Sequence, residues 1–166
     1  MVTTALAIVL SGCTQLAHRD EPEEAPNATQ FTLEDAKAFT IEARTEMAAY
    51  LPEDAASEVR EINESNALIP CGDDDDYVWP GPYLAVLDAD VDQQAVLDAI
   101  AAEWDTRGDW LVERQTNDDG YERVLITSAN GAHFAVGFHV QGSEFWVDSY
   151  SPCFHLPGGF AGGELY

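Results

Sequence analysis

Residues 110–150 form four segments of apolar and polar residues separated by short turns, and this pattern constrains the fold more than any other feature. The segments span 110–116, 121–127, 133–140 and 144–150, and the Asn-, Asp- and Gly-rich turns between them are typical of β-hairpins. Successive side chains of a strand point to opposite faces. In the third segment, burial is therefore expected for Phe134, Val136, Phe138 and Val140, and greater exposure for His133 and His139. The region predicts an antiparallel meander.

Two earlier segments have the three- and four-residue apolar spacing of amphipathic helices. The first is expected to begin at an N-cap on Thr32 and to end near Pro52. The second is expected to begin at a capping box of Asp90 with Gln93 and to end near Gly108. Residues 57–69 are interpreted as a first strand, and Pro-Gly-Pro at 80–82 indicates an edge strand or a bend. The predicted fold class is α+β, with two helices on one face of a mainly antiparallel sheet of four to six strands.

The chain is strongly acidic, with 7 basic residues, 31 acidic residues and a net charge of −24. Binding to nucleic acid depends on Lys and Arg contacts with phosphates, so nucleic acid is excluded as a partner. Anionic lipid headgroups are disfavoured for the same reason. The charge permits neutral or cationic partners, and it also keeps an exported protein soluble. Hydrophobic residues make up 46% of the chain, which suits a single domain with a real core.

The N-terminal segment ends in Leu10-Ser11-Gly12-Cys13, after a short apolar run. This motif resembles the lipobox of bacterial lipoproteins, in which the cysteine is acylated and becomes the mature N-terminus. No Lys or Arg precedes Cys13, although a signal peptide opens with a basic region. Either the true start lies upstream of Met1 or the motif is accidental, and we expect the first. The expected organisation is a signal peptide at 1–12, a lipidated linker at 13–30, one α+β domain at 31–155 and a loose Gly-rich tail at 156–166.

Two cysteines, Cys71 and Cys153, remain if Cys13 is lipidated. In an exported protein, an even number of remaining cysteines predicts a disulfide. The alternative is a catalytic thiol at Cys153, close in sequence to His155 and Asp148. We expect the disulfide, because neighbours in sequence do not make a catalytic pair.

The pattern of Pro70-Cys71 early in the domain and Ser151-Pro152-Cys153 after the last strand resembles small actinobacterial lipoproteins of unknown function. The resemblance extends loosely over residues 30–155. It implies a helix–sheet domain that is cross-linked near its C-terminal end. It brings no catalytic residue with it.

Few residues suggest chemistry. The run Asp73, Asp74, Asp75 and Asp76 offers oxygen ligands for a divalent cation, although such runs are usually solvated, and we expect no metal or cofactor. Ser149 and Ser151 lie too close in sequence to His155 to imply a catalytic triad. The candidate ligand-binding residues are the aromatic side chains Trp79, Tyr83, Trp146 and Tyr150, which are expected on elements that reach the surface. The alternative is that a helix packs over these rings.

The expected protein is an extracytoplasmic lipoprotein, held at the outer face of the bacterial cell membrane by its lipid. It is expected to act as a binding or interaction module for a neutral or cationic partner, and not as an enzyme. Two alternatives stay open, a cell-envelope hydrolase and a divalent-cation-binding lipoprotein. A pocket of convergent polar side chains would favour the hydrolase.

Overall fold

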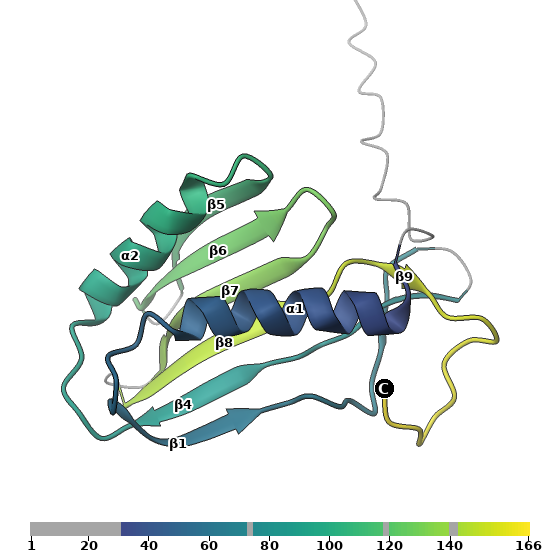
Figure 1. Ribbon diagram of the computed structural model, residues 1–166, viewed down its shortest axis with the longest axis horizontal. Coiled ribbons are helices and arrows are strands. Elements are labelled where there is room, and N and C mark those ends of the chain that lie inside the picture. The colour runs from purple at the N-terminus through teal and green to yellow at the C-terminus, as the bar shows by residue number, and fades with distance from the viewer. Residues whose placement is uncertain (1–30, 73–74, 118–119, 140–142) are drawn as a thin grey trace, which may run out of the picture.

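A computed structural model describes residues 31–72, 75–117, 120–139 and 143–166. Both helices lie on one face of a six-stranded antiparallel sheet with strand order β1-β4-β8-β7-β6-β5 (Figure 1). Strands β2, β3 and β9 form a second, smaller antiparallel sheet. The predicted α+β class is confirmed. The elements are α1 (Leu33–Ala48), β1 (Ala56–Glu61), β2 (Ile69–Pro70), β3 (Asp76–Val78), β4 (Tyr83–Leu87), α2 (Gln93–Asp105), β5 (Trp110–Thr116), β6 (Glu122–Ser128), β7 (His133–His139), β8 (Glu144–Tyr150) and β9 (Phe154–His155).

The four strands of the meander are β5 to β8, and each pairs with the next in antiparallel register. The last of them, β8, also pairs with β4, which places the antiparallel pair of β1 and β4 at the other end of the sheet. Strand β1 is an edge strand and is largely exposed, which explains why residues 57–69 show no clean apolar alternation. Of the predicted strand at residues 57–69, only 57–61 belong to a strand of the large sheet, so the prediction was too long at its C-terminal end.

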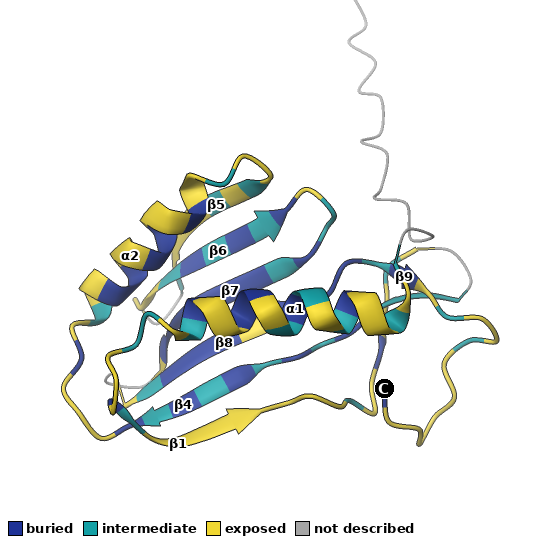
Figure 2. Ribbon diagram, in the orientation of Figure 1, coloured by how far each residue is buried: buried dark blue, intermediate teal, exposed yellow. Residues whose placement is uncertain are grey.

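The main core lies between the sheet and the two helices, where the inward rows of the central strands are buried (Figure 2). In β7 the predicted burial of Phe134, Val136 and Phe138 is confirmed, and His139 is exposed as expected. Val140 lies outside the described residues. Facing these rows are helix residues of the same core, which include Met47 of α1 and Val96, Ile100 and Trp104 of α2.

The start of α2 differs from the expectation. Its N-cap is Asp92, whose carboxylate accepts the backbone N–H of Ala95 at 3.1 Å, so Asp90 and Gln93 form no capping box. Val91 and Val96, which flank this cap, are both buried in the main core. This apolar pair fixes where the chain enters the helix, two residues later than the acidic pattern indicates. The N-cap on Thr32 of α1 is confirmed, with Asp35 N–H donating to its hydroxyl at 3.1 Å.

A second core surrounds Trp79 at the end of the molecule where the small sheet lies. It holds Ala36, Leu68, Trp79, Phe154 and Tyr166. The segment 156–166 was expected to be loose, and this is wrong for its last residue. The backbones of Tyr166 and Ser65 exchange two hydrogen bonds, of 2.8 and 2.9 Å, and the indole N–H of Trp79 donates to the Tyr166 carbonyl at 3.0 Å.

Cys71 and Cys153 are joined by a disulfide, with their Cα atoms 6.0 Å apart, as predicted. Cys71 follows β2 and Cys153 precedes β9, so the bond lies beside the small sheet. Among the described residues, no helix is both long and apolar enough to cross a bilayer.

Candidate functional site

Two of the four candidate aromatic residues do not reach the surface. Trp79 has no exposed area and lies in the second core, and Tyr83 is 8% exposed and packs edge-on against Phe145 of the main core. The expectation that both rings are surface features is wrong. The Pro-Gly-Pro bend turns the chain inward, because the Gly81 N–H donates to the Ser149 carbonyl and the Trp79 N–H donates to the Ser151 hydroxyl.

The other two candidates lie on the open face, the sheet face that points away from the helices. Trp146 is only 8% exposed, because it lies over Gly137 and stacks on His139 with ring centroids 5.0 Å apart. A Cβ on Gly137 would stand 2.9 Å from the indole ring, so only glycine leaves this space. Tyr150 is 36% exposed. Of the four predicted rings, Tyr150 alone offers a substantial surface to a ligand.

The open face also holds two ionisable groups, Asp148 and His133, whose pKa values shift in the direction that favours the uncharged form. Burial raises the pKa of Asp148, and the nearby positive charges of His139 and Arg123 oppose that shift. Burial and the charge of Arg123 lower the pKa of His133, which also hydrogen-bonds the Thr127 hydroxyl at 2.9 Å. Neither Asp148 nor His133 lines any of the three hollows that the described residues form around α2.

The residues considered for hydrolysis are not brought together. Ser149 and Ser151 are buried, and their hydroxyls donate to the carbonyls of Gly81 at 2.5 Å and of Pro152 at 2.8 Å. Asp148 lies on the face of β8 opposite to Ser149, because the side chains of neighbouring strand residues point to alternate faces. His155 pairs with Asp76 at 3.0 Å on the small sheet. A serine triad is therefore not assembled from these side chains.

The acidic run is only partly described. Asp73 and Asp74 lie outside the described residues, Asp75 has a positive φ of 70°, and Asp76 is engaged by His155. Within the described ranges, no three His, Cys, Asp or Glu side chains converge as a metal site. The cation-binding alternative gains no support from the described part of this run.

The interhelical cleft is a hollow of about 170 Å³ between α1 and the C-terminal end of α2. Its lining residues are Phe39, Glu42, Ala43, Glu46, Trp104, Arg107 and Trp110. Three aromatic rings make its apolar wall. Trp110 stacks on Phe39 at 5.7 Å and meets Trp104 edge-to-face at 4.5 Å. The indole N–H of Trp104 is buried and has no hydrogen-bond partner among the described residues.

Arg107 crosses the rim of this cleft. Its guanidinium carbon lies 4.0 Å from the Trp104 ring centroid, and its nitrogens reach Glu46 of α1 at 2.8 Å and Glu103 at 3.4 Å. The hydrogen bond with Glu46 raises the pKa of Arg107, so the side chain stays charged. The cleft therefore combines aromatic faces, carboxylates and a bound internal cation.

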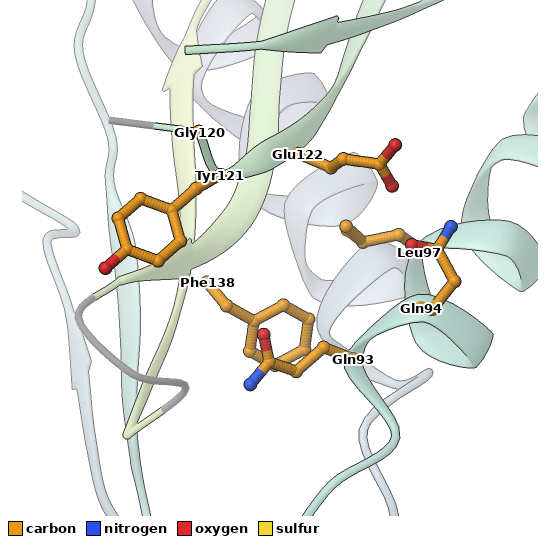
Figure 3. A pocket seen from close by; sticks show the side chains of 7 residues that line it. All are labelled: Gln93, Gln94, Leu97, Gly120, Tyr121, Glu122 and Phe138. Carbon is orange, nitrogen blue, oxygen red and sulfur yellow. The ribbon is translucent and has the colours of Figure 1, made fainter. Parts of the chain in front are cut away.

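A second hollow of about 200 Å³ lies near the start of α2 (Figure 3). Gln93, Gln94 and Glu122 supply polar groups there, and the side chains of Leu97, Tyr121 and Phe138 also line it. Its lining holds a single charged side chain, that of Glu122, and no cation. It therefore offers a ligand fewer charged and aromatic side chains than the interhelical cleft does.

No family model, curated protein or solved structure matches the chain. The case for a site therefore rests on the chain's own geometry. Sequence reasoning did not identify the interhelical cleft. A weak signal was present, because Arg107 follows Trp104 by three residues in the turn that ends α2, where its N–H donates to the Trp104 carbonyl.

Proposed function

We propose that this protein is a lipid-anchored, extracytoplasmic binding module that holds its ligand in the interhelical cleft. The observation that carries the proposal is the cleft itself, a hollow walled by Phe39, Trp104 and Trp110 with charged groups at its rim. Small-molecule sites commonly have this character, with aromatic walls and a few placed polar groups. The lipid anchor rests on the Leu10–Cys13 motif, which lies outside the described residues.

Binding rather than catalysis fits the side chains that line the cleft. They supply ring faces, two carboxylates and one guanidinium, and they include no hydroxyl, thiol or imidazole. Such groups hold a ligand by apolar contact, by cation–π attraction and by charge. Nucleophilic catalysis requires a nucleophile next to a base, and these lining residues do not provide that pair.

The anchor is tested by comparing the native protein with Cys13→Ser in the source bacterium. The native protein should fractionate with membranes and carry acyl mass on an N-terminal cysteine. The variant should lose both properties because the acylated atom is gone. An unprocessed N-terminus without acyl mass in the native protein contradicts the anchor.

The cleft is tested by nuclear magnetic resonance with a library of small aromatic and ammonium fragments. Bound fragments should shift the indole signals of Trp104 and Trp110 and leave the signal of Trp146 unchanged. Ala43→Leu fills the cleft and should abolish these shifts, whereas Ala102→Leu, on the exposed side of α2, should not. Shifts confined to the Trp146 signal would place the ligand on the open face and overturn the assignment.

A further inference from the structure

We infer that the ligand of the interhelical cleft carries an organic cation, a guanidinium or alkylammonium group, and that Arg107 occupies its place in the free protein. This inference rests on the proposed function, because it names the ligand class of the same cleft. Ligand binding then requires the Arg107 side chain to move aside. Arg107 acts as an internal competitor that lowers the apparent affinity.

A cation is already bound at this position in the free protein. Arg107 lies over the face of Trp104 at 4.0 Å, and its charge is balanced by Glu46 at 2.8 Å. An aromatic face together with a carboxylate is the combination that attracts guanidinium and ammonium groups from water. A ligand cation would find the same two partners once the arginine has left.

Negative charge is in excess around the rim. Glu46 and Glu103 both pair with the single guanidinium of Arg107. Glu42 lines the same cleft and takes part in none of the ion pairs among the described residues. The whole chain carries a net charge of −24. A second cation therefore meets favourable charge both locally and at long range.

The Arg107 side chain can leave without disturbing the backbone. Its N–H donates to the Trp104 carbonyl at 3.1 Å, and its carbonyl accepts from the Trp110 N–H at 3.0 Å, so the turn is held by main-chain atoms. The side chain itself is 34% exposed, and exposed ion pairs contribute little to stability. Rotation of the side chain into solvent exposes one face of Trp104 and frees Glu46.

The competing interpretation is that Arg107 only ties the end of α2 to α1. The two interpretations predict opposite effects of Arg107→Ala on binding. If the arginine is a competitor, its removal should strengthen the binding of a free cation. If it is only a structural tie, its removal should leave cation binding unchanged or weaken it by loosening the helices.

The test uses guanidinium sulfate and choline chloride at low millimolar concentration, with urea and 3,3-dimethylbutan-1-ol as neutral analogues of similar shape. Dissociation constants are measured from the indole signals of Trp104 and Trp110. Arg107→Ala should bind the cations about tenfold more tightly than the native chain. Arg114→Ala is the matched control, because it breaks the 2.5 Å ion pair with Asp98 outside the cleft. It should bind as the native chain does.

Two further variants keep the test decisive. Phe39→Leu keeps an apolar side chain in the cleft but removes a ring, so it should weaken cation binding. If Arg107→Ala does not fold, Arg107→Gln removes the charge while retaining most of the side chain. Neutral analogues that bind as well as the cations would overturn this inference and leave the cleft as a ligand site. Probes that shift neither indole signal in any variant would overturn both proposals.

Discussion

Gly81→Ala is expected to destabilise the protein strongly, because the space for a Cβ at this position is already filled. The added atom would stand 2.0 Å from the Trp79 ring and 3.0 Å from an Arg44 guanidinium nitrogen. Contacts of that length cannot persist, so either the ring or the backbone of residue 81 must move. Both are held in place.

The magnitude follows from what each movement breaks. Displacing Trp79 breaks the 3.0 Å hydrogen bond from its indole to Tyr166 within a fully buried core. Displacing the backbone breaks the bond from the Gly81 N–H to Ser149 and the bonds that its carbonyl accepts from Arg44 and Ser149. A lost buried hydrogen bond costs about 1–3 kcal/mol and overpacking costs about 1–3 kcal/mol more. We expect a loss of about 3–5 kcal/mol in the free energy of unfolding.

The assay is urea unfolding under non-reducing conditions, followed by circular dichroism. Gly108→Ala is the control, since no atom lies within 4 Å of its added Cβ, and it should be neutral or stabilise by up to about 1 kcal/mol. Trp79→Leu removes the ring that clashes. The double variant with Gly81→Ala should therefore lose at least about 1 kcal/mol less than the sum of the single variants. Additive losses, or a Gly81→Ala loss below about 1 kcal/mol, would refute the reasoning.

Three other predictions concern the core, the cross-link and the open face. Phe138→Ala should cost about 3–5 kcal/mol by urea unfolding. His139→Ala, which loses its stacking on Trp146 and its interaction with Asp148, should cost about 0.5–1.5 kcal/mol, and equal losses would contradict the assigned strand face. Replacing Cys71 and Cys153 by Ser should lower stability by about 2–5 kcal/mol, and an unchanged unfolding midpoint would contradict a disulfide contribution. Since His133 has a lowered pKa, the unfolded state takes up its proton first as the pH falls below the usual 6.5, and the native chain should lose stability relative to His133→Gln. Parallel stability curves from pH 8 to 5 would show that His133 contributes nothing.

The fold could be predicted from sequence wherever burial follows a simple period. The alternation in residues 133–139 identified both faces of β7, and the apolar spacing of residues 33–48 identified α1. The small sheet of β2, β3 and β9 was not predicted, because its strands have only two or three residues and pair across long stretches of sequence. The ordered Tyr166 was missed for a related reason. Its partners, Ser65 and Trp79, are remote in sequence, so composition alone indicated a loose tail.

Exposure of aromatic side chains was harder to predict than the elements that carry them. Trp79 lies next to a Pro-Gly-Pro bend, which suggests a surface loop, but long-range hydrogen bonds draw that bend into the second core. Trp146 has the predicted strand face, yet Gly137 across the pairing lets it lie flat under His139. The sheet face to which a side chain points follows from the alternation along its strand. Its exposure depends on the size of the residues beside it on neighbouring strands, and the sequence alone does not say which residues these are.

The distribution of positive charge explains why the interhelical cleft is the better candidate for a foreign cation. Three of the basic side chains lie over tryptophan faces, two over Trp79 and one over Trp104. Both rings are almost fully buried in the free protein, so the difference lies in the cations over them. Lys37 at 5.3 Å and Arg44 at 6.0 Å lie over Trp79, and Arg44 is itself fully buried and hydrogen-bonded to the Ile62 and Gly81 carbonyls, so it cannot give way to a ligand. Around Trp104 one partly exposed arginine faces a surplus of carboxylates beside an open hollow. The cation–π attraction therefore stabilises the fold at Trp79. At Trp104 a ligand cation can exchange with Arg107.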